Sequence, residues 1–334
     1  MESKVQISSC PDSRCTADGW RRPLGGSAAT TAAQLPPVVA LGKFDALHKG
    51  HQALAIAAAH LGGHPWLISF SGMAAVLGWP RRLPLVAPCD RDRVLRRWAA
   101  SCRGLVPREC AIPFTEVRTM SPEAFVALLA EELRVAGVVV GANYRFGYRA
   151  AGDAGLLQRL GPQYGMQVRV LDLVGSYCGS LSEGELGPGC FPPPEEGAGA
   201  GATVSSSRIR EELAAGGMVQ VEECLGRPYR LVASMAGASA TQKLGGPALR
   251  LPSDTFLNQP PGPGHYQVAV GCCEASGCTL ACPGDDGGAA PWQQGQLVID
   301  ESGLTLGGVA VGEEWREQGG LLVMDFLGNK EEMV

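Results

Sequence analysis

Short apolar runs alternate with helical patterns in the N-terminal part of the chain. Runs bounded by turn residues predict buried strands at 37–41, 66–70, 138–140 and 167–171. Helices are predicted at 52–61, at 91–101 with Asp90 as N-cap, and from Ser121 to 133, where Ser, Pro and Glu open the helix. Short strands that are almost wholly apolar and alternate with helices predict an α/β fold with a parallel sheet covered on both faces. Ligands bind at the carboxyl ends of such strands, so we expect a site in the loops after Leu41, Phe70 and Val140.

The pattern changes twice further along the chain. Gly, Pro, Ser and Glu dominate 175–203, which predicts a flexible insertion, and a helical pattern returns over 205–224. Short strands separated by Gly/Pro turns then follow at 265–270, 296–300 and 321–326. They predict a small antiparallel β domain, for which a barrel is one arrangement. Residues 1–36 show no hydrophobic period, so we expect an unstructured leader, a main domain over 37–229 and a smaller β-rich domain over 230–334.

Composition excludes several classes of partner. The net charge of −5 over 334 residues argues against general nucleic-acid binding, although arginines cluster locally at 81–82 and 91–97. No run approaches the roughly 18 apolar residues of a membrane span, so no membrane partner is expected. The 12 cysteines in so long a chain indicate free thiols rather than a disulfide framework. The group Cys272, Cys273, Cys278 and Cys282 lacks a CxxC pair, and we favour core and loop residues there over a zinc site.

The segment 42–51, GKFDALHKGH, is the first candidate site. It holds His48 and His51, two of the five histidines, where a buried strand ends and a helix begins. Free backbone N–H groups and the helix dipole make such a position an anion site, and Gly50 lets a phosphate approach the backbone. The imidazoles can donate hydrogen bonds to a triphosphate as charge builds on leaving pyrophosphate. The alternative is a pair of surface loop histidines.

The segment 205–210, SSSRIR, is the second candidate. Ser206, Ser207 and Arg208 stand at a helix start, where hydroxyls and an arginine suit a second phosphate contact. The plainer alternative is an ordinary capping box with Ser207 as the cap. That box calls for Glu or Gln three residues on, where this chain has Arg210.

The segment 140–153, VGANYRFGYRAAGD, is the third candidate, because it follows a predicted strand. Asn143 can form hydrogen bonds with the polar edge of an acceptor substrate. Tyr144 or Phe146, next to Gly147, can stack on a planar ring. Taken alone, this segment is better explained as a structural turn with a packed aromatic ring.

Together these three segments, in this order, resemble the FMN adenylyltransferase (FAD synthetase) family. The family patterns are G-x-F-D-x-x-H-x-G-H, V-G-x-x-[FY]-x-F-G-x-x-x-x-G-D and S-S-[ST]-R-[IV]-R, and the segment 225–229, LGRPY, is similar to the family sequence before its C-terminal barrel. The resemblance implies a Rossmann-like nucleotidyltransferase that transfers AMP from ATP to FMN with Mg²⁺, giving FAD and pyrophosphate. Catalytic roles are implied for His48, His51 and Arg208, whereas the metal ligands are undefined. ATP binding is implied for Gly42, Phe44, Asp45, His48, Gly50, His51, Ser206, Ser207 and Arg208, and flavin binding for Asn143, Tyr144, Phe146 and Gly147.

The sequence also departs from bacterial members of this family. Phe70-Ser-Gly-Met73 replaces a Phe-x-Pro-His-Pro-like segment that helps place the flavin, and 251–255 (LPSDT) lacks the Asn of the riboflavin kinase motif. The β-rich tail is therefore expected to lack kinase activity. The resemblance is to the plant plastid enzymes, which implies a chloroplast protein with a transit peptide, with a cytoplasmic location as the alternative. Two other functions stay open: another nucleotidyltransferase with the histidine motif, and an inactive flavin-binding relative.

Overall fold

The computed structural model describes residues 35–172, 203–243, 246–274, 292–310 and 319–328. The predicted leader, up to residue 34, and the predicted insertion, up to residue 202, lie outside the described residues. Cys278 and Cys282 of the cysteine group also lie outside them, whereas Cys272 and Cys273 belong to a strand described below. No helix in the described ranges has the length and apolar character needed to cross a membrane.

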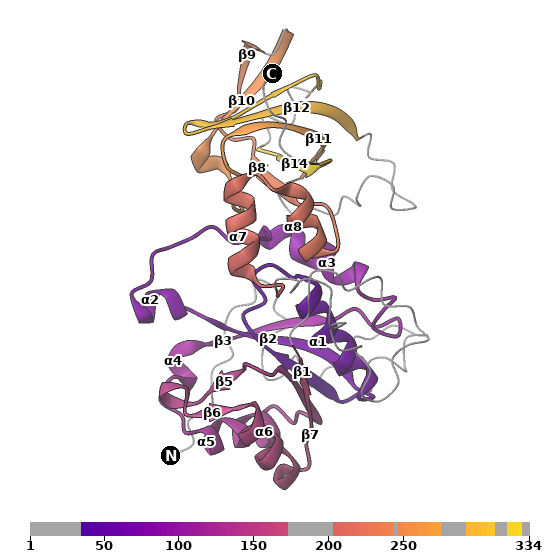
Figure 1. Cartoon of the computed structure of the whole chain (residues 1–334), viewed down its shortest axis with the longest axis vertical. Helices are drawn as coiled ribbons and strands as arrows, with labels where there is room; N and C mark the ends of the chain where they lie inside the picture. The colour runs from indigo at the N-terminus through magenta and orange to yellow at the C-terminus, as the bar shows by residue number, and fades with distance from the viewer. Residues whose placement is uncertain (1–34, 173–202, 244–245, 275–291, 311–318, 329–334) are drawn as a thin grey trace, which may run out of the picture.

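A parallel sheet forms the N-terminal part of the described chain (Figure 1). Its order is β3-β2-β1-β4-β7, with β1 at Pro37–Leu41, β2 at His64–Ser71, β3 at Arg108–Pro113, β4 at Gly137–Gly141 and β7 at Gln167–Leu171. All four predicted strands are confirmed. The strand β3 was not predicted, because its sequence RECAIP begins with two charged residues and leaves only a short apolar run. Successive strands run outward in one direction from β1 to β3 and in the other from β4 to β7, so the strand order reverses between β1 and β4.

Helices cover both faces of this sheet and form two apolar layers. One layer packs β1, β2 and β4 against α5 (Pro122–Ala127), a following π-turn (Leu128–Glu132) and α6 (Ala154–Leu160). The other packs them against α1 (Lys49–His60) and α3 (Arg91–Arg97). Shorter helices complete this part: α2 at Met73–Leu77 and α4 at Phe114–Val117, with the hairpin β5 (Arg145–Phe146) and β6 (Gly152–Asp153). The predicted α/β fold with both sheet faces covered is confirmed.

The helix that begins at Arg91 differs from its prediction in length and in its cap. It ends at Arg97, rather than at 101. The Asp90 side chain makes no capping hydrogen bond, because its carboxylate instead pairs with Arg93 and Arg230. Asp90 therefore holds the N-cap position, as predicted, but its side chain serves ion pairs instead of capping the helix.

A helix pair follows in place of the single helix predicted over 205–224. The first, α7 (Ser206–Ala215), ends at Gly216 with a φ of 80°, a left-handed conformation that glycine adopts readily, and α8 (Met218–Leu225) begins after Gly217. Ser205 is the N-cap of α7, since its hydroxyl accepts from the Arg208 N–H at 3.2 Å. The capping-box alternative with Ser207 as cap is wrong.

The C-terminal part is an antiparallel sheet, as predicted. In the described residues its order is β8-β14-β11-β12-β13-β10-β9. The strands are β8 Arg230–Ser234, β9 Ser239–Lys243, β10 Gly246–Pro252, β11 Gly264–Cys273, β12 Gln293–Asp300, β13 Gly303–Gly307 and β14 Leu321–Phe326. Figure 1 shows this sheet at one end of the molecule, with α7 and α8 between it and the parallel sheet.

One apolar core joins α7 and α8 to the C-terminal sheet. Ile209, Leu213 and Val221 of the helices are fully buried against residues of β8 to β14. The same core includes Ala46 and Leu85 from loops of the N-terminal part. The division into domains at residue 229 stays a prediction, whereas the packing shows that apolar contacts cross it.

Candidate active site

The loop after β1 leads directly into α1 and carries both motif histidines. His48 is the N-cap of α1, with extended backbone (φ −83°, ψ 174°), and its Nδ1 accepts a hydrogen bond from the His51 N–H at 3.3 Å. The two imidazole rings are stacked with centroids 3.6 Å apart. Because Nδ1 of His48 is an acceptor, the neutral ring carries its proton on Nε2. The histidine motif is thus a helix start, as the sequence predicts.

Both imidazoles are uncharged at neutral pH. Burial, followed by the charge of Arg227, lowers the pKa of His48 to about 4. Burial and the neighbouring His48, Arg91 and Arg227 lower the pKa of His51 well below its ordinary value. A neutral imidazole still has one N–H to donate. These histidines therefore offer hydrogen bonds to an anion rather than a full positive charge.

His51 also has an unused polar atom. Its Nδ1 is buried and has no hydrogen-bond partner among the described residues. Leaving such a group unpaired costs about 1–3 kcal/mol, so unpaired buried polar atoms are uncommon and call for an explanation such as a functional role. A phosphate-bearing ligand bound at this helix N-terminus would account for it.

Arginines from two other elements hold the backbone of this loop. Arg91 of α3 donates to the Phe44 carbonyl at 2.7 Å. Arg227, which follows α8, donates to the carbonyls of Leu47 at 2.7 Å and Ala46 at 2.9 Å. Phe44 and Leu47 have positive φ angles of 37° and 47°, which side-chain-bearing residues adopt at a cost. The arginine contacts stabilise a strained loop that sets the position of His48.

Asp45 links the first motif to the second. Its Oδ2 lies 2.6 Å from Arg210 of α7, and its Oδ1 accepts from the Leu85 N–H at 3.2 Å. The predicted SSSRIR segment therefore does reach the histidine loop, but through Arg210. Arg208 instead lies 3.7 Å from Glu212 in an ion pair, and Ser206 and Ser207 form the first turn of α7.

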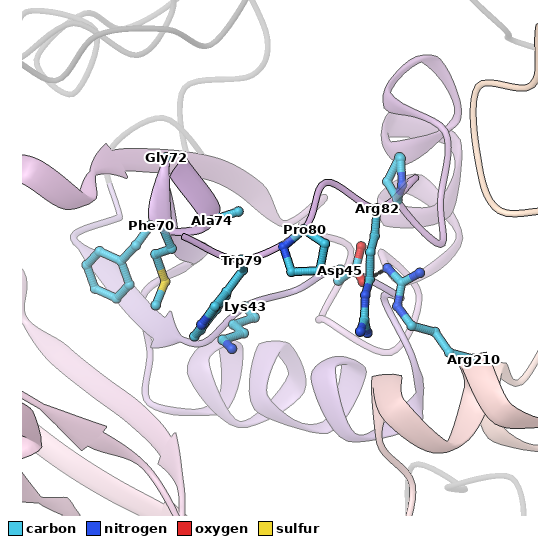
Figure 2. Close-up of a pocket in the computed structure, with 11 residues that line it drawn as sticks. Lys43, Asp45, Phe70, Gly72, Ala74, Trp79, Pro80, Arg82 and Arg210 are labelled. Carbon is cyan, nitrogen blue, oxygen red and sulfur yellow. Dashed lines mark hydrogen bonds and ion pairs between the residues drawn. The ribbon is translucent and has the colours of Figure 1, made fainter. Parts of the chain in front are cut away.

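A cavity of about 830 Å³ opens beside this loop (Figure 2). One end is apolar, with Phe70 and Trp79, and the other is charged, with Asp45, Arg82 and Arg210. Met73 also lines the cavity. Lys43 lies between them, its Nζ 4.7 Å from the centre of the Trp79 ring. Its size and mixed lining are typical of a small-molecule site. Sequence reasoning pointed to the loop after Phe70, but it missed Trp79 and Arg82.

The third motif lies at the end of β4, and none of its predicted residues lines this cavity. Asn143 is exposed, whereas Phe146 is 6% exposed and packs on Phe125 at 5.6 Å between ring centres. Tyr144 is stacked on Phe146, and burial raises the pKa of its hydroxyl, which lacks a partner in the described residues. Gly147 has a φ of 74°, and a Cβ there would meet Pro122 at 3.0 Å. Phe146 and Gly147 therefore act in packing, and flavin contact by this loop stays a prediction.

Arg91, Arg210 and Arg227 are functional candidates that the sequence did not single out. Arg210 stands inside the second motif and Arg227 inside LGRPY, so the motifs themselves were the available signal. Their targets lie 165 and 180 positions away along the chain. No local pattern reveals such pairings.

The fold is a Rossmann-like α/β fold, and the helix start with its two histidines lies at the carboxyl edge of β1, next to the reversal of strand order. Residues 100–182 match the FAD synthetase family model. This match agrees with the resemblance that the three motifs carry.

Curated relatives support the same assignment. The chain is 45% identical to FAD synthetase 1, chloroplastic, and 44% identical to FAD synthetase 2, chloroplastic, both from Arabidopsis thaliana. These matches cover 69% and 70% of this chain but 62% and 60% of the relatives, so the chain spans less than two thirds of their length. A bifunctional riboflavin kinase/FMN adenylyltransferase from Pseudomonas fluorescens is 28% identical, over 70% of this chain and 68% of that protein.

A solved structure shares the fold. It is described as a macrolide-efflux protein from Streptococcus pneumoniae and aligns with a TM-score of 0.65, covering 90% of this chain and 88% of that one. At 18% sequence identity, this similarity concerns the architecture alone.

Proposed function

We propose that this protein is an FMN adenylyltransferase, which transfers AMP from ATP to FMN and releases pyrophosphate. The observation that carries the proposal is the helix start of α1, where His48 and the unpaired Nδ1 of His51 lie together at a helix N-terminus. The family match of residues 100–182 and the plant relatives named FAD synthetase support FAD as the product, and the bacterial relative named FMN adenylyltransferase supports FMN as the acceptor.

The reaction needs no nucleophile from the protein. The phosphate of FMN attacks the α-phosphorus of ATP, a new P–O bond forms, and the bond to pyrophosphate breaks with the electron pair leaving on pyrophosphate. Catalysis then consists of positioning and of stabilising the charge on the leaving group. The α1 N–H groups and the Nε2–H of His48 are the donors that we assign to the phosphates.

The cavity beside the histidine loop is the binding site that we propose for FMN. Its apolar residues Phe70, Met73 and Trp79 suit a planar aromatic ring. Its cationic residues Arg82 and Arg210 suit a phosphate group. The cavity volume of about 830 Å³ lies within the range of small-molecule sites. Phe70, Gly72 and Met73, which stand where the bacterial pattern has its Phe-x-Pro-His-Pro-like segment, line this cavity.

Mg²⁺ is proposed as a companion of ATP. The described residues contain no group of three His, Cys, Asp or Glu side chains able to hold a metal ion. Asp45, the carboxylate in the histidine loop, is engaged by Arg210 and by the Leu85 N–H. The residues present therefore do not form a protein-built metal site, and Mg²⁺ bound to the nucleotide phosphates is the arrangement that matches its usual chemistry.

The test is an acceptor assay with purified full chain, ATP, Mg²⁺ and FMN. Flavin fluorescence should fall as FAD forms, and chromatography should show FAD and pyrophosphate. His51→Ala should depress turnover more than FMN affinity, because the lost donor acts on developing charge. Riboflavin in place of FMN should give no product, because the tail is proposed to lack kinase activity.

Each of the other outcomes selects another function. Turnover with nicotinamide mononucleotide or phosphopantetheine, and none with FMN, would replace this proposal with another nucleotidyltransferase. FMN binding without turnover would indicate an inactive flavin-binding relative.

A plastid location is part of the proposal, because both plant relatives are named chloroplastic. Residues 1–36 fused to a fluorescent protein should direct it into plastids, and a cytoplasmic signal would contradict this.

A further inference from the structure

The segment 84–91 lies between the C-terminal sheet and the histidine loop, and we name it the bridge segment. Leu85 is 1% exposed and belongs to the core formed by α7, α8 and the C-terminal strands. Ala87, also 1% exposed, packs with Val232 of β8 and with Leu321 and Val323 of β14. The bridge segment is therefore part of the core of the C-terminal unit, although it belongs in sequence to the N-terminal part.

Polar contacts fix the start of this segment to the C-terminal unit. Asn258 is fully buried, its Oδ1 accepts from the Val232 N–H at 2.9 Å, and its Nδ2 donates to the carbonyls of Arg230 at 2.8 Å and Leu85 at 3.2 Å. The next residue, Gln259, donates its backbone N–H to the Pro84 carbonyl at 2.9 Å. A buried amide with all these partners holds the backbone at 84–85 in one position.

The other side of Leu85 binds the histidine loop. While its carbonyl accepts from Asn258, its N–H donates to Oδ1 of Asp45 at 3.2 Å. Asp45 stands three positions before His48, in the strained loop. A single residue of the bridge segment thus connects the C-terminal unit to the loop that feeds α1.

A second connection runs through buried charges. Arg230 of β8 pairs with Asp325 of β14 at 2.6 Å and with Asp90 at 3.2 Å, and Asp90 pairs with Arg93 at 2.6 Å. The side chains of these four residues are at most 7% exposed. Buried charges persist only when paired, so this network fixes the start of α3 relative to the C-terminal sheet. Arg91, next to Asp90, is the residue that donates to the Phe44 carbonyl.

From these two connections we propose that the C-terminal sheet is a positioning element of the nucleotide site, with Asn258 and Arg230 as its positioning residues. They hold the bridge segment, which holds Phe44 and Asp45, and these two residues shape the loop that ends in His48. This assigns a role to a β-rich unit that lacks the riboflavin kinase motif. The kinetic part of the test rests on the proposed function. The order of the loop is measured by hydrogen exchange and does not depend on turnover.

The test compares three single variants of the full chain. Asn258→Ala removes the buried amide, and Arg230→Lys keeps the charge but loses the two-pronged contact with Asp325. Arg250→Lys is the matched control, because Arg250 also contacts an aspartate, Asp300, through two nitrogens, but on β10 and β12 away from the bridge segment. Amide hydrogen exchange of residues 42–48 without nucleotide, and kcat/KM for ATP, are measured for each.

The expected result is a tenfold or greater rise in exchange at 42–48, and a similar fall in kcat/KM for ATP, for Asn258→Ala and Arg230→Lys. Arg250→Lys should change neither quantity by more than about twofold, because substitutions away from a buried network usually have small effects. Combining Asn258→Ala with Asp45→Ala, which removes the acceptor of the Leu85 N–H, should give less than the product of the two single effects on exchange, since both variants lose a contact to Leu85.

Unchanged exchange and kcat/KM in folded Asn258→Ala or Arg230→Lys would overturn the proposal, as would equal effects in Arg250→Lys. If Asn258→Ala does not fold, Arg230→Lys decides. Raised exchange in a protein that makes no FAD would support the positioning role while removing the proposed enzymatic activity.

Discussion

Arg227→Lys tests whether the geometry of the histidine loop, rather than charge near it, governs catalysis. Arg227 is 6% exposed, and its guanidinium donates to Leu47 and Ala46 in the loop and to Leu225 at the end of α8. Lysine keeps the positive charge, but a single ammonium on a flexible stem lacks the planar fork that spans two neighbouring carbonyls.

The size of the effect follows from the contacts that are lost. A hydrogen bond to a charged group contributes about 1.5–3 kcal/mol, and an ammonium at this position retains one of the two loop carbonyls. The variant should therefore lose about 1.5–3 kcal/mol of loop stabilisation, which corresponds to a fall of about 10- to 150-fold in kcat/KM for ATP if the loop must be ordered to bind the transition state.

The assay is steady-state FAD formation with kcat and KM determined for ATP and FMN, together with denaturant unfolding. Arg96→Lys is the control, because Arg96 forms an exposed ion pair with Asp92 on α3, with 71% of its side-chain surface accessible, and such pairs contribute little. It should behave like the unmodified protein in both measurements.

Two results would refute the reasoning. If unfolding free energy falls but kcat/KM does not, Arg227 stabilises the fold without shaping the site. If neither changes, the two carbonyl contacts contribute nothing measurable. Burial and then the charge of Arg227 lower the pKa of His48, and lysine keeps that charge. A shift in the pH profile of kcat/KM in Arg227→Lys would therefore indicate a cause other than loop geometry.

Three further predictions concern other parts of the site and the fold. Gly50→Ala should lower kcat/KM while leaving unfolding free energy unchanged or higher, because alanine favours the helix but its Cβ would lie 3.1 Å from the His48 ring. Trp79→Ala should raise KM for FMN about tenfold and leave KM for ATP unchanged, since aromatic stacking contributes about 1–3 kcal/mol per ring. Burial lowers the pKa of His64 to about 4, so the unfolded chain binds more protons than the folded chain below pH 6.5. The free energy of unfolding therefore decreases as the pH is lowered through this range. The loss between pH 7 and pH 5 should be about 2 kcal/mol for this residue, measured by denaturant unfolding.

Each of these three has a control or an internal comparison. Gly246→Ala adds a Cβ with no heavy atom within 4 Å and should leave activity unchanged. If Trp79→Ala raises KM for ATP as well as for FMN, Trp79 does not contact the flavin specifically. His64→Gln should flatten the pH dependence of unfolding, and an unchanged slope would show that His64 is not its source.

Local sequence patterns determined the elements and the chemistry of the first motif. The run at 37–41 and the run at 167–171 became β1 and β7 with the predicted bounds, because a buried strand needs only a continuous apolar stretch between turns. The histidine motif was predicted as a helix start from its own residues, and His48 caps α1. The β-rich character of the chain after residue 230 was likewise predicted from short apolar runs separated by Gly/Pro turns.

Only the tertiary structure decided which groups hold the site together. It placed Arg210 on Asp45 and Arg227 on the carbonyls of Leu47 and Ala46, and it gave Asp90 to Arg230 rather than to a helix cap. It also put the Phe146 ring in the core, where the motif alone left stacking on a ligand open. A helix or strand signal arises from neighbours along the chain, whereas an ion pair across 140 or more positions depends on where packed elements bring side chains together, and no local period encodes that.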